Sequence, residues 1–153
     1  MRVKTLLTTF ALILFSLVGQ AQNTNVFDKL SQRKDIKTVH VSKSLLGMIS
    51  KMDMGGADIA HLADKLKQID VYTSESGEAA KFMKAEANFF ATNKAYESFM
   101  TVKEKNQTVI FYGQKEGEKF KDLVMLSEEA DKYTIVRMVG EFTAKDIQQI
   151  VKK

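Results

Sequence analysis

The chain has 153 residues with no cysteine and no proline, and its formal net charge is +4. The absence of cysteine excludes disulfides, thiol nucleophiles, zinc–thiolate sites and lipid attachment through an N-terminal cysteine. Lysines are scattered among acidic residues and form no stripe interleaved with aromatic residues, so we expect no nucleic-acid partner.

The first predicted element is a secretory signal peptide over residues 1–21. Arg2 and Lys4 precede an uncharged apolar run over residues 6–18, and small residues follow up to Ala21. This arrangement is typical of a signal peptide cut after Ala21. The run is too short to cross a hydrocarbon core of roughly 30 Å, and no later run is long enough. We therefore expect an exported protein, periplasmic or secreted, that begins at Gln22 and has no transmembrane segment.

Residues 22–153 are expected to form a single domain, because domains of about 100 to 150 residues are the commonest size. Val39 and Val41 alternate with polar residues, which indicates a strand. Ile59, Leu62 and Leu66 follow helical spacing. The predicted elements of this half are a helix at 26–33, a strand at 37–42, helices at 43–52 and 58–68, a strand at 69–74 and a long helix at 75–93.

The second half of the chain reads as four strands and a closing helix. The strands are predicted at 98–103, 108–114, 123–127 and 133–139, with links at 105–107, 115–117 and 128–131. Such short links are typical of hairpins and predict an antiparallel meander. Thr143 and Asp146 have the spacing of a capping box at the start of the last helix. The predicted class is α+β, a mainly antiparallel sheet with helices packed on it.

Three methionines and a histidine lie close together, at Met48, Met52, Met54 and His61. Thioethers and imidazole are soft donors that could hold Cu(I). However, Met48 and Met52 are one turn apart on a predicted helix whose other apolar residues need a core, where methionine commonly fills gaps. Core packing is the preferred interpretation, and we predict no metal site.

Gly55 and Gly56 separate two predicted helices. Backbone amides at a helix N-terminus can bind phosphate, but no Gly-x-Gly-x-x-Gly or Walker pattern surrounds the pair. The glycines more simply supply a turn with positive φ, with Asp58 near the cap. We treat Gly55 and Gly56 as a candidate mobile loop and expect no cofactor.

Catalytic patterns are lacking in the sequence. Neither Gly-x-Ser-x-Gly, His-Glu-x-x-His nor an EF-hand spacing occurs. Glu128 and Glu129 fall in a predicted hairpin turn, where acidic residues are usually solvated, and His40 alternates onto the polar face of its strand. We predict no catalytic residue and favour a protein that is not an enzyme.

Two charged residues interrupt apolar patterns. Glu86 falls near the centre of the apolar stripe of the long predicted helix, and Arg137 shares a strand face with Ile135 and Val139. A buried carboxylate needs a partner, and the planar guanidinium can bond both of its oxygens. We hypothesise that Glu86 and Arg137 form a buried pair; the alternatives are that Glu86 turns out at the helix edge or that Arg137 lies on an exposed sheet face.

Several stretches carry a family resemblance, including "VFDKL", "VHVSKSLLGMI", "YTSES" and "DLVMLSEEADKYTIVRMVGEFT". In this order they resemble a family of exported Bacteroidetes proteins classed as a domain of unknown function (DUF 4252). The resemblance covers essentially all of residues 22–153. It implies no activity and no catalytic residues, and it suggests an envelope-stress or sigma-factor-linked role. Members often carry a lipid-attachment cysteine, whereas this chain has Gln22.

The function predicted from the sequence is a non-enzymatic, exported binding or interaction module of the bacterial envelope, with a protein or a small ligand as partner. The alternative is a small ligand carrier or enzyme with a pocket near Gly55 and Gly56. An apolar pocket with converging polar groups would favour the alternative. A filled core with an exposed strand or apolar patch would favour the interaction module.

Overall fold

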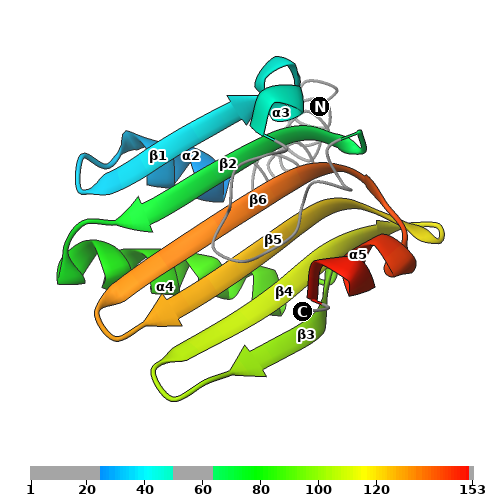
Figure 1. The fold of residues 1–153 in the computed structure, drawn as a ribbon. Coiled ribbons are helices and arrows are strands. Elements are labelled where there is room, and N and C mark those ends of the chain that lie inside the picture. Colours follow the sequence, from blue (N-terminus) through cyan, green and yellow to red (C-terminus); the bar gives the residue numbers. More distant parts are fainter. Residues whose placement is uncertain (1–24, 50–63, 152–153) are drawn as a thin grey trace, which may run out of the picture.

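The computed structural model describes residues 25–49 and 64–151, which form a six-stranded sheet with helices on both faces (Figure 1). Every neighbouring pair of strands is antiparallel, and the strand order is β1-β2-β6-β5-β4-β3. The strands are β1 (Ile36–Ser42), β2 (Leu66–Ser74), β3 (Tyr96–Lys103), β4 (Gln107–Glu116), β5 (Lys119–Glu129) and β6 (Lys132–Phe142). Because β3 to β6 are neighbours in both chain and sheet, the predicted α+β class and four-strand meander are confirmed.

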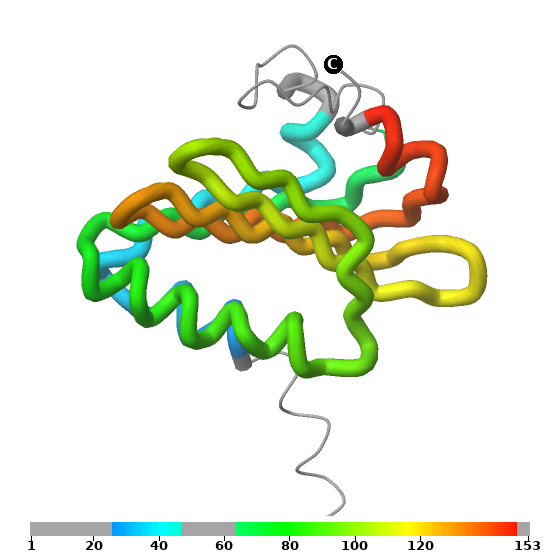
Figure 2. Tube along the Cα trace, turned by 90° about the horizontal axis from the view of Figure 1, so that it is seen from below, coloured from blue at the N-terminus to red at the C-terminus, as the bar shows by residue number. Residues whose placement is uncertain are grey.

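The helices divide between the two faces of the sheet (Figure 2). They are α2 (Asn25–Gln32), α3 (Lys43–Ile49), α4 (Gly77–Thr92) and α5 (Ala144–Val151). Helices α2 and α4 cover one face, which we call the α4 face, and α3 and α5 lie on the other, the α5 face. None of the described helices has the length and hydrophobicity needed to span a bilayer.

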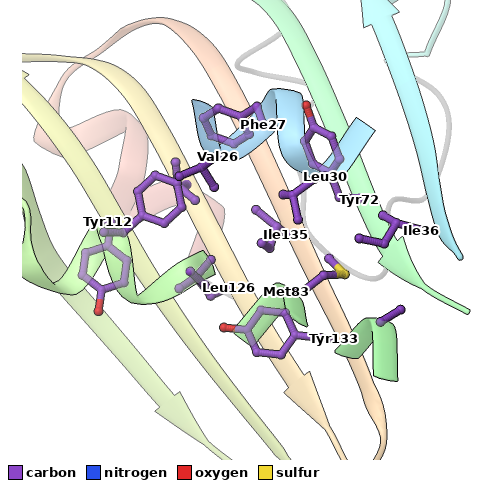
Figure 3. Close-up of a cluster of buried hydrophobic side chains, with 14 residues drawn as sticks. Val26, Phe27, Leu30, Ile36, Tyr72, Met83, Tyr112, Leu126, Tyr133 and Ile135 are labelled. Carbon is purple, nitrogen blue, oxygen red and sulfur yellow. The ribbon is translucent and has the colours of Figure 1, made fainter. Parts of the chain in front are cut away.

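Each face has its own apolar core. On the α4 face, Phe27 and Leu30 of α2 and Met83 of α4 pack on Ile135 of β6, together with aromatic side chains of the neighbouring strands (Figure 3). On the α5 face, the fully buried Phe142 is part of a second cluster that α3 and α5 cover. The two clusters exist because successive strand residues point to opposite faces.

Helix α4 begins where the sequence supplies a cap. The Oγ of Ser76 accepts a hydrogen bond from the amide of Ala79 at 3.1 Å, as an N-cap serine does. At α5, the amide of Thr143 donates to Asp146 at 2.8 Å, and the amide of Asp146 donates to the Thr143 hydroxyl at 3.3 Å. The capping box predicted at Thr143 and Asp146 is confirmed.

The predicted helix at 58–68 is wrong over its last residues, because residues 66–68 belong to β2. The helical spacing had counted Leu66, but Leu66 lies opposite Gly140 of β6 and fills the core of the α5 face. A β-bulge between Leu66 and Gln68 also disturbs the alternation that would have marked a strand in the sequence.

The predicted hairpin links at 115–117 and 128–131 are too long. Strand β4 continues to Glu116 and β5 to Glu129, so Glu128 and Glu129 are strand residues and not turn residues. Gly117 and Ala130 adopt positive φ, 64° and 45°, which makes the tight reversals possible. Tighter turns add strand length on both sides and so enlarge the sheet.

Candidate functional site

A row of polar side chains crosses the α4 face. His40 of β1 lies opposite Asp70 of β2, and Asp70 lies opposite Arg137 of β6, so all three point to this face. The Asp70 residue is only 5% exposed. His40 Nδ1 lies 2.5 Å from one of its carboxylate oxygens, and the side-chain amide of Gln68 donates to the other at 2.5 Å.

Arg137 is held by a second buried carboxylate, that of Asp122 on β5. Its Nη2 donates to Asp122 Oδ2 at 2.9 Å and its Nε lies 3.2 Å from both oxygens. The guanidinium also stacks on the Phe27 ring, 4.4 Å from the ring centre. Burial acts to lower the pKa of Arg137, but the hydrogen bonds and charge of Asp122 overcome it and raise that pKa.

Tyr96, at the start of β3, completes this row. Its hydroxyl donates to Asp122 Oδ2 at 3.4 Å, and its ring meets Phe90 edge-on at 5.0 Å. Burial, followed by the charge of Asp122, raises the pKa of Tyr96. The hydroxyl therefore stays protonated as a donor to Asp122, which ties the outer strand β3 to the middle of the sheet.

The polar row is a satisfied network. Within the described residues, every buried side-chain nitrogen and oxygen has a hydrogen-bond partner, and no group of three or more histidine, aspartate or glutamate side chains is placed to hold a metal ion. A fully bonded network stabilises one arrangement of the strands. It joins β1 to β2 through the hydrogen bond between His40 and Asp70, and β5 to β6 through the ion pair between Asp122 and Arg137.

The structure gives Glu86 and Arg137 different partners. Glu86 bonds Lys29 of α2 at 3.3 Å, at the rim of the helix layer, while Arg137 bonds Asp122. Arg137 therefore does bond a buried carboxylate on the α4 face. That carboxylate comes from the neighbouring strand β5 and not from α4. The sequence does contain a signal for this, since strand alternation places Asp122 on the same face as the buried Val124 and Leu126.

A hollow of about 360 Å³ lies at the end of the sheet where β2 begins and β6 ends. Lys65 on its wall bonds Asp146 of α5 at 2.6 Å, and Lys119 lies 3.8 Å from Glu141. The hollow carries more lysines than acidic residues. It is lined by Lys43, Asp64, Lys65, Lys67, Lys119, Glu141 and Thr143.

The outer edge of β1, which we call the β1 edge, pairs with no described strand. Its seven residues keep a continuous register with β2, without a bulge, from Ile36 to Ser42. Val39, in the middle of β1, is 41% exposed, and Leu45 of α3 is 47% exposed; these are the exposed large hydrophobic residues of the described chain. The edge also carries Lys37 and His40, but its regular backbone with an exposed valine at the centre is a template for a further strand.

The opposite edge, formed by β3 and called the β3 edge, is built differently. A β-bulge between Ser98 and Met100 interrupts its register with β4. Glu97 and Lys103 place charges at its two ends, and Glu104 follows at once in the turn. Bulges and charges are the usual means by which sheet edges avoid pairing with other chains.

An apolar row crosses all six strands on the α5 face and ends at the β1 edge. Its members lie directly opposite one another from strand to strand, so they point to the same face. From one edge to the other they are Val39, Val71, Val136, Met125, Phe111 and Met100. The row ends at Val39, whose side chain is exposed to solvent.

Other residues singled out in the sequence lie outside the described part of the chain. These are the signal peptide with Gln22, the glycines Gly55 and Gly56, and the donors Met52, Met54 and His61. Met48 falls in α3, but its side chain is not described. The interpretations of these residues remain predictions.

The fold and these features define an α+β protein with an antiparallel sheet, helices on both faces and a regular outer strand, β1, whose outer edge pairs with no strand of residues 25–49 and 64–151. The chain belongs to the family described as domain of unknown function (DUF4252), which matches residues 29–150. The match spans every strand of the sheet, and it confirms the family predicted from the sequence. Comparisons with curated proteins and with solved structures found no match.

Proposed function

We propose that this protein is an exported, non-enzymatic interaction module of the bacterial envelope, which binds an extended polypeptide segment along the β1 edge. The observation that carries the proposal is the contrast between two edges: the β1 edge is regular, pairs with no described strand and has Val39 exposed at its centre, whereas the β3 edge is bulged and has Glu97 and Lys103 near its ends. Strand addition gives affinity through main-chain hydrogen bonds and specificity through alternate side chains.

The filled interior also supports a binding module over an enzyme. Both apolar clusters are closed, and the buried polar atoms of the described residues are all bonded to protein groups. A catalytic site usually keeps a polar group free for its substrate, together with a pocket that excludes water. Among the described residues, the sheet edge is the feature that best fits recognition of a polypeptide.

Export and an accessory role in an envelope-stress or sigma-factor-linked system are part of the same proposal. Their support is the sequence: Arg2 and Lys4 before an apolar run that ends in small residues, and the family resemblance. Mass spectrometry of the protein from the periplasm or medium should find Gln22 as the first residue. An exported form that retains Met1 would contradict the export proposal.

Photo-cross-linking tests the binding edge directly. A photoreactive residue replacing Val39 should yield discrete cross-linked polypeptides when the full chain is expressed in its native envelope. The matched control replaces Thr101 of the β3 edge and should yield none. Equal cross-linking from both positions, or none from Val39, would contradict the proposal.

The second candidate function is a small ligand carrier or enzyme with a pocket near Gly55 and Gly56. One observation favours a carrier of small anions: the 360 Å³ hollow, whose lining includes Lys43 and Lys67. Inorganic phosphate titrated into the labelled protein should then give saturable NMR shifts around the hollow. The Lys43→Ala/Lys67→Ala variant should lose them, whereas shifts that grow linearly in both proteins would reject a carrier.

A further inference from the structure

We propose that the segment which pairs with β1 is the β1 strand of a second copy, antiparallel to the first, with Val39 opposite Val39 of the copy. This inference rests on the proposed function and names its partner. The pairing would join two six-stranded sheets into one continuous sheet about a twofold axis, a self-complementary contact of the kind that closes a dimer.

The backbone of β1 is suited to this register. The amide of Glu75 donates to the carbonyl of Asp35 at 2.9 Å, so residues 35 and 75 form a hydrogen-bonded pair of the antiparallel ladder. Because such pairs alternate along a strand, odd positions of β1 bond inward to β2 and even positions point outward. Ile36, Thr38 and His40 thus present amides and carbonyls to the second strand.

The side chains also match when the strand meets itself at Val39. Lys37 then lies opposite Val41 of the copy, and Thr38 lies opposite His40 of the copy. No two like charges face each other, and like charges directly opposite are destabilising. The two Val39 side chains form a pair without backbone bonds, in which the side chains lie closest together.

The apolar row of the α5 face gives the reason for choosing a second copy over another extended segment. In one molecule the row runs through all six strands and stops at Val39, which is 41% exposed. In the proposed register Val39 meets the end of an identical row, so the row continues without a break into the second sheet. Burial of this apolar side chain stabilises the pairing.

The β3 edge offers no comparable self-pairing. The bulge between Ser98 and Met100 shifts the alternation of outward amides and carbonyls in the middle of the strand. Thr101 of β3 therefore serves as the control position for Val39, because both residues lie on outer strands of the same sheet.

Molar mass in solution is the first measurement. The full exported chain should sediment with twice its monomer mass, Val39→Lys should sediment as a monomer, and Thr101→Lys should remain a dimer. All three should show the same circular dichroism spectrum, because both positions are on the surface. A dimer that survives Val39→Lys would overturn the proposal.

Disulfide cross-linking tests the register. The chain has no cysteine, so a single introduced thiol can react only with the same thiol of a second copy. Directly opposite residues in an antiparallel pair without backbone bonds are about 4.5 Å apart between Cα atoms, within the range for a disulfide. Val39→Cys should form a covalent dimer on mild oxidation, and Lys37→Cys should not. Efficient cross-linking of Lys37→Cys in place of Val39→Cys would overturn the register.

The outcomes separate this inference from the proposed function. A monomer whose photoreactive residue at position 39 captures a different polypeptide would overturn the dimer and leave the binding edge standing. A monomer that captures nothing from position 39 would overturn both. A dimer that Val39→Lys abolishes, with Val39 cross-linking to itself, supports both.

Discussion

The two outer strands of the sheet, β1 and β3, differ in the side chains that attach them to the rest of the sheet and in the regularity of their outer edges. On the α4 face, β3 is attached through the partly buried ring of Tyr96, which packs on Phe90 and bonds Asp122. On the same face, β1 is attached through the buried Ile36 at its start and through His40, whose side chain is 57% exposed and bonds Asp70. The β3 edge is bulged, whereas the β1 edge is regular and has an exposed valine at its centre.

The difference is the basis of the proposal that the β1 edge takes a partner. An edge strand exposes a row of amides and carbonyls, and monomeric proteins commonly block that row with bulges and charges. This protein blocks one row and leaves the other regular. The proposed pairing of the β1 edge with another strand would account for this difference.

The strongest test of the attachment of β3 is removal of Asp122. Asp122→Ala should lower the free energy of unfolding by about 3 kcal/mol, because it leaves the partly buried Arg137 without its carboxylate. Urea unfolding of Asp122→Ala, Arg137→Met and the double variant measures this, and the double variant should lose less than the sum of the two.

Glu86→Gln is the control for that cycle. Its partner Lys29 is exposed, so the loss should be no more than about 1 kcal/mol. Additive losses at Asp122 and Arg137, or a loss at Glu86 as large as that at Asp122, would contradict the assignment of partners.

A second prediction concerns the ring of Tyr96. Tyr96→Ala should lower the free energy of unfolding by about 2 to 4 kcal/mol, because it removes a partly buried aromatic ring that packs on Phe89 and Phe90. Hydrogen exchange should show faster opening of β3 with β1 unchanged. Faster exchange at both edges would mean that the two are not attached independently.

The third prediction uses Asp146, which lies in the first turn of α5 and bonds Thr143 and Lys65, so its substitution should leave both edge strands unchanged. Burial acts to raise the pKa of Asp146, but hydrogen bonds from Lys65 and Thr143 overcome it and lower that pKa to about 2. Because folding lowers the pKa, the stabilisation is fully present above about pH 4 and is lost as the pH falls through about 2.

Asp146→Asn should therefore cost about 1 to 2 kcal/mol at pH 7 and almost nothing near pH 2. Thermal unfolding of the two proteins at a series of pH values measures the difference. A cost that does not change with pH would show that the carboxylate charge is not responsible.

The smallest effect is expected at the β1 edge. His40→Ala should lower the free energy of unfolding of the monomer by less than about 1 kcal/mol, because the imidazole is largely exposed and Gln68 still donates a hydrogen bond to the buried carboxylate of Asp70. The measurement should use the monomeric Val39→Lys background, so that a loss of pairing does not enter the result. A loss comparable to that of Tyr96→Ala would remove the difference in attachment between the two edges.

Local patterns in the sequence were enough for the elements whose own residues decide them. The meander follows from alternating residues between short polar links, and the start of α5 follows from the spacing of Thr143 and Asp146. The beginning of β2 was not predictable in this way. Leu66 fits a helical spacing, and only its place opposite Gly140 makes it a strand residue.

The sequence by itself therefore determined the α+β class, the meander, the capping box and the family of this protein. It also led to the hypothesis that Arg137 takes a buried carboxylate, because a buried charge needs a partner, although the hypothesis named Glu86. Only the tertiary structure decided that Asp122 is this partner, and that β1 and β3 are the outer strands. Strand order and partners across strands depend on residues distant in the chain, and local periodicity carries no information about them.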